Sequence, residues 1–193
     1  MTASLRWTSA DLLNLAGDGK LREIIDGEMF VSTQPHLNHQ ILSANFATEF
    51  NIWDPQRRHG VTAIAPGLVF ADDDDVAPDV IWISNGLRAA AERGGKLDAA
   101  PEIVIEILSR GSTNIARDRE TKLKLYSRRG AEEYWIADWP RHCVEVYRRD
   151  GLALVLAAAL GPGDTLTSPL LPDFAVPIDR LFLGIPSGAD GGE

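Results

Sequence analysis

The sequence PEIVIEILS at residues 101–109 decides the fold class of this chain. Its centre, Ile103–Leu108, is a nearly unbroken aliphatic run, which is typical of a strand covered on both faces. The segment 114–130 has a Ser/Thr entry and Gly130 as its stop, so a helix is predicted there. EEYWIAD at 132–138 follows as a second strand. Strand, helix and strand in this order form a βαβ unit, with a crossover that is nearly always right-handed.

The segments on either side extend this unit into an α/β fold. Asp26-Gly27 between two apolar stretches predicts an N-terminal hairpin with strands at Arg22–Ile25 and Glu28–Ser32. We expect a mixed central β-sheet flanked by helices, in a single domain over residues 1–183 with a disordered tail at 184–193. The further expected elements are an amphipathic helix at 36–53, strands within 60–83, a loop or short exposed helix at 87–96, and a hairpin at 143–160.

The composition excludes several classes of protein. Nineteen Lys and Arg residues stand against 28 Asp and Glu residues, a net charge of −9, so a general nucleic-acid coat is excluded and any contact with phosphate must be local. The single cysteine, Cys143, cannot form an intrachain disulfide or a cysteine-based zinc cluster. The longest apolar run, Leu152–Leu160, is far shorter than the ~20 residues that span a bilayer. We therefore expect a soluble, cytoplasmic protein.

Glu106 is the most informative residue of the chain. Alternation along the strand places it on one face with Val104 and Leu108. A carboxylate buried there costs several kcal/mol unless it is protonated, paired or bound to a metal. Two interpretations follow: a functional acid, or a structural ion pair with a basic residue of the next helix.

Asp79 is a second candidate acid. It follows Pro78, which lacks an N–H and so suits the start of a strand, and it precedes the apolar run Val80–Ile83. Two carboxylates from neighbouring strands form the hard oxygen site that Mg²⁺ prefers, completed by water and substrate phosphate.

Lys122 is the candidate cation of the same site. Helical spacing places Ile115, Arg119, Lys122 and Tyr126 on one face of the predicted helix. A right-handed crossover folds this helix onto the sheet, where Lys122 can approach Glu106. The alternative is a local pair between Lys122 and Asp118, four residues apart.

Pro78-Asp79 followed by Glu106 inside an apolar strand resembles the PD-(D/E)xK nuclease superfamily. That superfamily carries a lysine two residues after the second acid, but Leu108 stands there in this chain. The whole sequence is more similar to one branch, the Uma2 family of restriction-endonuclease-like proteins, in which the lysine role moves to the following helix, as Lys122 suggests. The matching segments are Arg22–Glu28, Pro35 with His39, Pro78–Val80, Glu106–Ser109, Asp118 with Lys122 and Tyr126, and Gly130–Asp138.

The resemblance implies a restriction-endonuclease-like core and an Mg²⁺-dependent (or Mn²⁺-dependent) endonuclease that hydrolyses DNA phosphodiester bonds. Asp79, Glu106 and the backbone carbonyl of Ile107 are then the implied metal ligands. Lys122 orients the attacking water or neutralises charge on the phosphoryl group. Cutting both strands of a duplex usually takes two active sites, so a homodimer is expected.

Three accessory residues match the same family pattern: Glu23, His39 and Tyr126. His39 is equally consistent with a histidine at the edge of the core, and Tyr126 with packing. At the level of function, two alternatives remain: a catalytically inactive nuclease-like fold that binds nucleic acid or protein, and a different Mg²⁺-dependent hydrolase that uses the same carboxylates.

The charge pattern between Arg110 and Gly130 leaves two interpretations. Seven basic residues stand against two acidic ones there, which indicates either a local stripe for a phosphate backbone or a solvated helix face. The acidic stretch Asp72–Asp75 lacks the spacing of a calcium-binding loop and is predicted to be a solvated turn.

Overall fold

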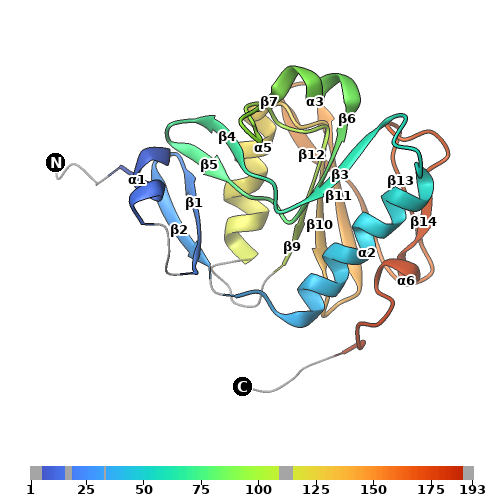
Figure 1. Cartoon of the computed structure of the whole chain (residues 1–193). Coiled ribbons are helices and arrows are strands. Elements are labelled where there is room, and N and C mark those ends of the chain that lie inside the picture. The colour runs from blue at the N-terminus through green and yellow to red at the C-terminus, as the bar shows by residue number, and fades with distance from the viewer. Residues whose placement is uncertain (1–5, 16–18, 33, 109–114, 189–193) are drawn as a thin grey trace.

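The computed structural model describes residues 6–15, 19–32, 34–108 and 115–188 (Figure 1). Within these residues the strands form two six-stranded sheets and one two-stranded sheet. The helices are α1 (Ser9–Asn14), α2 (Leu37–Trp53), α3 (Asn85–Ala91), the π-helical η1 (Arg117–Lys122), α5 (Leu123–Arg129) and α6 (Ile178–Leu181). The first strands are β1 (Leu21–Ile25), β2 (Glu28–Ser32), β3 (Gly60–Ile64), β4 (Leu68–Ala71), β5 (Asp74–Val76), β6 (Val80–Ser84), β7 (Glu92–Arg93) and β8 (Lys96–Leu97). The remaining strands are β9 (Ile103–Ile107), β10 (Glu133–Asp138), β11 (Cys143–Asp150), β12 (Ala153–Leu160), β13 (Thr165–Thr167) and β14 (Ala175–Pro177).

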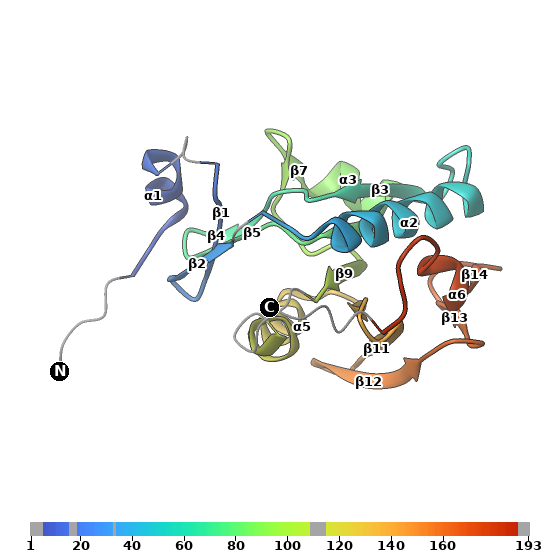
Figure 2. The ribbon, with the colours of Figure 1, turned by 90° about the horizontal axis from the view of Figure 1, so that it is seen from below.

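The first six-stranded sheet has the strand order β12-β11-β10-β9-β6-β3, with β9 and β10 near its centre. β9 and β10 run parallel and the other neighbours are antiparallel, so the predicted mixed sheet and its strand–helix–strand unit are confirmed. All residues of β9 and β10 are buried, as the aliphatic run predicted. Figure 2 shows the reason: α2 lies on one side of β9 and α5 lies on the other.

Alternation along β9 divides the core into two clusters. Ile103, Ile105 and Ile107 pack with α2 in one cluster, whereas Val104 and Leu108 pack with α5 in the other. Glu106 shares the second face, as predicted, and therefore points toward η1 and α5. The position of this acid follows from the two-residue period of a strand.

The second sheet, in the order β2-β1-β5-β4-β8-β7, contains the predicted N-terminal hairpin. Asp26 and Gly27 form its turn with φ of 53° and 76°, the left-handed conformation that a two-residue hairpin turn requires. β1 pairs with β5 on its other side, which joins the hairpin to the other strands of this sheet (Figure 1).

Other segments agree with the sequence only in part. Residues 87–96, expected to form a loop or a short exposed helix, do form the short, mostly exposed helix α3 up to Ala91, where the Ser84 hydroxyl caps the helix. The β7–β8 hairpin that follows was not predicted, and β8 in it pairs with β4. The predicted helix at 114–130 ends at Gly130 as expected, but over Arg117–Lys122 it is π-helical, and its entry at 109–114 lies outside the described residues. Within the predicted tail, Ile185 packs in the core, and 189–193 lie outside the described residues.

The acidic stretch is not a fully solvated turn, because Asp74 is buried. Its carboxylate accepts hydrogen bonds from Arg128 and Arg129 on α5 and from the backbone N–H of Asp26. Burial favours the neutral acid, but these donors outweigh burial and hold the pKa of Asp74 below its usual value. Asp74 therefore ties the N-terminal hairpin and its sheet to α5.

Replacing Asp74 with asparagine is expected to lower the free energy of unfolding at pH 7 by about 2 kcal/mol, because two arginines lose their buried anion. The pKa of Asp74 is lower in the folded protein than in the unfolded chain. Its carboxylate therefore stabilises the fold above pH ~4, and this stability is lost as the pH falls through the pKa of the folded protein. The difference from wild type should therefore shrink toward pH 3 in urea titrations. The exposed Asp72→Asn is the control, and a pH-independent difference would contradict the linkage.

The part of the chain described here contains no helix that is long and apolar enough to cross a membrane.

Candidate functional site

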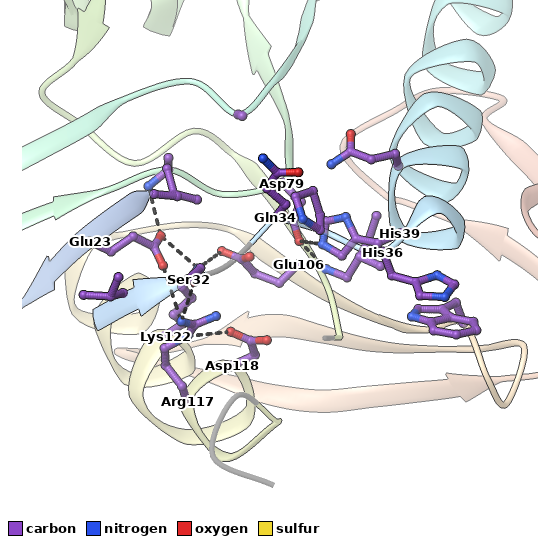
Figure 3. A pocket seen from close by; sticks show the side chains of 18 residues that line it. Glu23, Ser32, Gln34, His36, His39, Asp79, Glu106, Arg117, Asp118 and Lys122 are labelled. Carbon is purple, nitrogen blue, oxygen red and sulfur yellow. Dashed lines mark hydrogen bonds and ion pairs between the residues drawn. The ribbon is translucent and has the colours of Figure 1, made fainter. Parts of the chain in front are cut away.

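A cavity of about 530 Å³ lies between the β1–β2 hairpin, the start of α2, the adjoining ends of β6 and β9, and η1. Figure 3 shows the charged side chains that converge on it from these separate elements. The polar and charged lining residues are Glu23, Ser32, Gln34, His36, His39, Gln40, Asp79, Glu106, Arg117, Asp118 and Lys122. Five of the six side chains predicted for the site line this cavity. The sixth, Tyr126, does not line it but donates a hydrogen bond to Glu106, which does.

Asp79 and Glu106 lie side by side because β6 and β9 are antiparallel neighbours. Val80 pairs with Ile105, so the residue before β6 lies level with Glu106. Asp79 Oδ2 accepts a hydrogen bond of 2.7 Å from the Ile107 N–H and lies 3.1 Å from His39 Nε2. Burial favours the neutral acid, but His39, Lys122 and the Ile107 N–H keep the pKa of Asp79 below its usual value. Asp79 is therefore held as a carboxylate.

Lys122 lies between two buried carboxylates. Its Nζ is 2.9 Å from Glu106 Oε1 and 3.0 Å from Glu23 Oε1, and each of the three side chains is at most 3% exposed. Tyr126 donates its hydroxyl to the same Glu106 oxygen at 3.0 Å, and Glu23 also accepts the Ala77 N–H at 3.0 Å. Lys122 therefore contacts Glu106, as predicted, and does not pair with Asp118 alone.

The cavity carries an excess of negative charge. Glu23, Asp79, Glu106 and Asp118 face the two cations Lys122 and Arg117. Burial first, and then the other three carboxylates, raise the pKa of Glu106 well above its usual range. Burial alone would lower the pKa of Lys122, but Glu106, Glu23 and Asp118 raise it above its ordinary value, so the amine stays charged. A divalent cation would offset the remaining negative charge.

The oxygen donors suit such an ion. Asp79 and Glu106 supply two carboxylates, and Ile107 lines the same cavity. Mg²⁺ is usually bound through one or two carboxylates, with waters and substrate phosphates in the other positions. Among the residues that the structure describes, no group of three or more His, Cys, Asp or Glu side chains is arranged to hold a metal ion. His39 Nδ1 is also buried in the wall without a hydrogen-bond partner.

Arg117, Asp118 and Ser32 are lining residues that the sequence analysis did not place in the site. The sequence indicated Asp118 as part of the family pattern and as a local partner of Lys122, and it indicated Arg117 only as part of the basic stripe. The missed signal is the winding of η1: a spacing of five, rather than three or four, joins Arg117 to Lys122 on one side.

The basic stripe itself is largely engaged inside the fold. Arg119 pairs with Glu145 at 2.6 Å, and Arg128 and Arg129 bind Asp74. Arg110 lies outside the described residues. These contacts do not support a phosphate-binding stripe along the whole helix, so the excess of basic residues mainly reflects structural ion pairs.

Comparison with known proteins shows the family to which this sequence belongs. Residues 9–179 match the model of the Uma2 family, which is described as "Putative restriction endonuclease". The chain belongs to the Uma2 family. No curated protein sequence matches this Uma2 chain.

The solved structures that resemble this Uma2 protein include the following two. A crystal structure of a "putative nuclease belonging to DUF820" from Anabaena variabilis superposes with a TM-score of 0.71 at 20% identity, covering 91% of this chain and 97% of that one. The expected nuclease-like fold, a mixed sheet flanked by helices with an N-terminal hairpin, is thereby confirmed. The type IIG restriction endonuclease BpuSI gives a TM-score of 0.42 at 10% identity, covering 78% of this chain and 16% of that one.

Proposed function

We propose that this Uma2 protein is an Mg²⁺-dependent (or Mn²⁺-dependent) endonuclease that hydrolyses phosphodiester bonds of DNA. The observation that carries the proposal is the convergence of Asp79, Glu106 and Lys122 in one cavity from three separate elements. The family description and the nuclease-like fold support the same reaction class. A fold selected for stability alone has no reason to bury three carboxylates around one cavity, with a fourth partly buried beside them, because each costs free energy when it is desolvated.

Asp79, Glu106 and the Ile107 carbonyl are the groups that would hold the ion. When bound there, Mg²⁺ supplies a Lewis acid for a phosphoryl oxygen and favours deprotonation of the attacking water. His39 positions the Asp79 carboxylate through its Nε2, and the Ile107 N–H fixes the same oxygen. These contacts leave the carboxylate little freedom to rotate.

Lys122 acts as a cation in this proposal, because its raised pKa excludes a role as general base. Its ammonium has three N–H donors. Glu106 accepts one of them and Glu23 Oε1 lies 3.0 Å from the same nitrogen, which leaves a donor for an oxygen of a phosphoryl group in the cavity. Lys122 then stabilises the negative charge that develops on the phosphoryl group during attack. Glu23 and Tyr126 position this pair.

A panel of labelled substrates tests the activity: linear, nicked, branched and single-stranded DNA, together with RNA. We expect cleavage of at least one DNA substrate that requires Mg²⁺ or Mn²⁺ and stops when a chelator is added. If the wild-type protein leaves every substrate intact but binds one of them, the inactive binding fold is the better description.

Calorimetric titration with Mn²⁺ tests the metal site independently of activity. Glu106→Gln removes one proposed ligand, so we expect its affinity to fall by at least tenfold relative to wild type. Glu133→Gln is the matched control, because Glu133 is equally buried on the neighbouring strand β10 but lies outside the cavity. Identical curves for wild type and Glu106→Gln would remove Glu106 from the metal site.

A further inference from the structure

The helix after β9 starts with an unusual winding. Arg117–Lys122 is π-helical, and regular α-helix begins only at Leu123. Segments with i→i+5 hydrogen bonds are rare and occur frequently at functional sites. In an α-helix, Arg117 would lie about 140° around the axis from Lys122, and the two side chains would point to different surroundings.

Contacts show that the wider turn places Arg117 beside Lys122 (Figure 3). Both cations approach Glu23: Lys122 Nζ lies 3.0 Å from Oε1 and Arg117 Nη1 lies 4.0 Å from Oε2. Arg119, which α-helical spacing places on the face of Lys122, pairs instead with Glu145 on β11. Because of the π-helical turn, Arg117 and not Arg119 lies at the wall of the cavity.

Arg117 makes longer ion pairs than Arg128, the arginine that binds Asp74. Its Nε is 3.3 Å from Asp118 Oδ1, and its Nη1 donates to Ser32 Oγ at 3.2 Å. By contrast, Arg128 donates to both oxygens of Asp74 at 2.8 Å. Short contacts to both oxygens are the strong geometry for arginine and a carboxylate. Arg117 instead contacts one oxygen of Asp118 at 3.3 Å and one oxygen of Glu23 at 4.0 Å. Its planar fork of five donors can therefore take a further anion at the cavity.

We propose that Arg117 and Ser32 form a phosphate-binding subsite beside Lys122, for the phosphate next to the scissile one on a DNA strand. This inference rests on the proposed nuclease function. The guanidinium fork matches two phosphate oxygens, and the Ser32 hydroxyl from β2 donates to the same group. Asp118 and Glu23, at 3.3 and 4.0 Å, position the guanidinium through ion pairs. The subsite fixes the strand relative to Lys122 and Glu106.

Binding of a short fluorescein-labelled single-stranded DNA, followed by anisotropy, tests the subsite. The measurements use the full chain in the Glu106→Gln background, in which we expect the strand to stay intact. Adding Arg117→Gln should weaken binding about tenfold or more. The slope of log affinity against log salt should also fall by about 0.7, the value for one lost phosphate contact on a single strand. A merely structural arginine would not change this slope.

Arg119→Gln is the matched control, since it removes the same charge from the same turn but faces Glu145; its affinity and slope should equal those of the parent. Arg117→Lys should keep the slope and lose affinity, because lysine retains the charge without the fork. If a thermal melt shows that Arg117→Gln is unfolded, the Arg117→Lys variant is used instead, and an affinity for DNA equal to that of the parent would overturn the subsite.

If the parent binds DNA and Arg117→Gln binds it with the same affinity, the subsite alone is wrong. If the parent binds no DNA, the nuclease function and the subsite both fail.

Discussion

Replacing Lys122 with methionine is expected to lower the rate of metal-dependent DNA cleavage by about 10³-fold, because the phosphoryl group loses its cation in a buried site. The same change should lower the free energy of unfolding by about 3 kcal/mol, since Glu106 and Glu23 are left without the amine that lies within 3.0 Å of both. Single-turnover cleavage and urea unfolding measure the two effects separately.

A second substitution separates stability from catalysis. Glu106→Gln together with Lys122→Met removes one acid with the cation, so we expect it to recover most of the lost stability and none of the cleavage. Lys124→Met is the control, because Lys124 is an exposed lysine of the same helix and should change neither quantity appreciably. Cleavage by Lys122→Met within tenfold of wild type, at equal folded concentration, would exclude the proposed role of Lys122.

Replacing Glu106 with glutamine is expected to lower cleavage by about 10³-fold while the protein remains at least as stable as wild type. The physical reason is the raised pKa of Glu106, which comes first from burial and then from its acidic neighbours. An acid whose folded-state pKa is raised stabilises the fold below its unfolded value and loses that contribution as pH rises through the folded value. Any gain in stability of Glu106→Gln should therefore be largest above pH 7 and vanish near pH 4.

Glu133→Gln is the informative comparison for this result. Glu133 is a buried glutamate on β10 that accepts hydrogen bonds from Trp135 Nε1 at 2.6 Å and from Ser168 Oγ at 2.9 Å. It also lies 3.3 Å from Arg148. This substitution should cost about 1–2 kcal/mol of stability and leave cleavage by the folded protein unchanged. If the two variants show the reverse pattern, Glu106 is a structural acid and the catalytic assignment is wrong.

The strand containing Glu106 could be predicted because its signal is local. A continuous aliphatic run bounded by a break and a helix fixes a buried strand, and the two-residue period then fixes which face Glu106 occupies. The hairpin at Asp26-Gly27 could be predicted for the same reason, since a tight turn with two positive φ angles strongly favours this residue pair. The convergence of Asp79 and Glu106 was predicted by treating their strands as neighbours, and the family resemblance pointed to the same pair of acids.

The sequence by itself determined the order of the elements, the inward direction of Glu106 and the approach of Lys122 to the sheet, because each depends on spacing within a few residues or on a single crossover. Only the tertiary structure decided that Glu23 shares Lys122, that Asp74 collects two arginines, and that Arg117 rather than Arg119 faces the cavity. Ion-pair partners far apart in the sequence depend on how the two sheets pack. The π-helical winding of η1 could not be predicted in the same way, because the prediction of helix faces assumes 3.6 residues per turn.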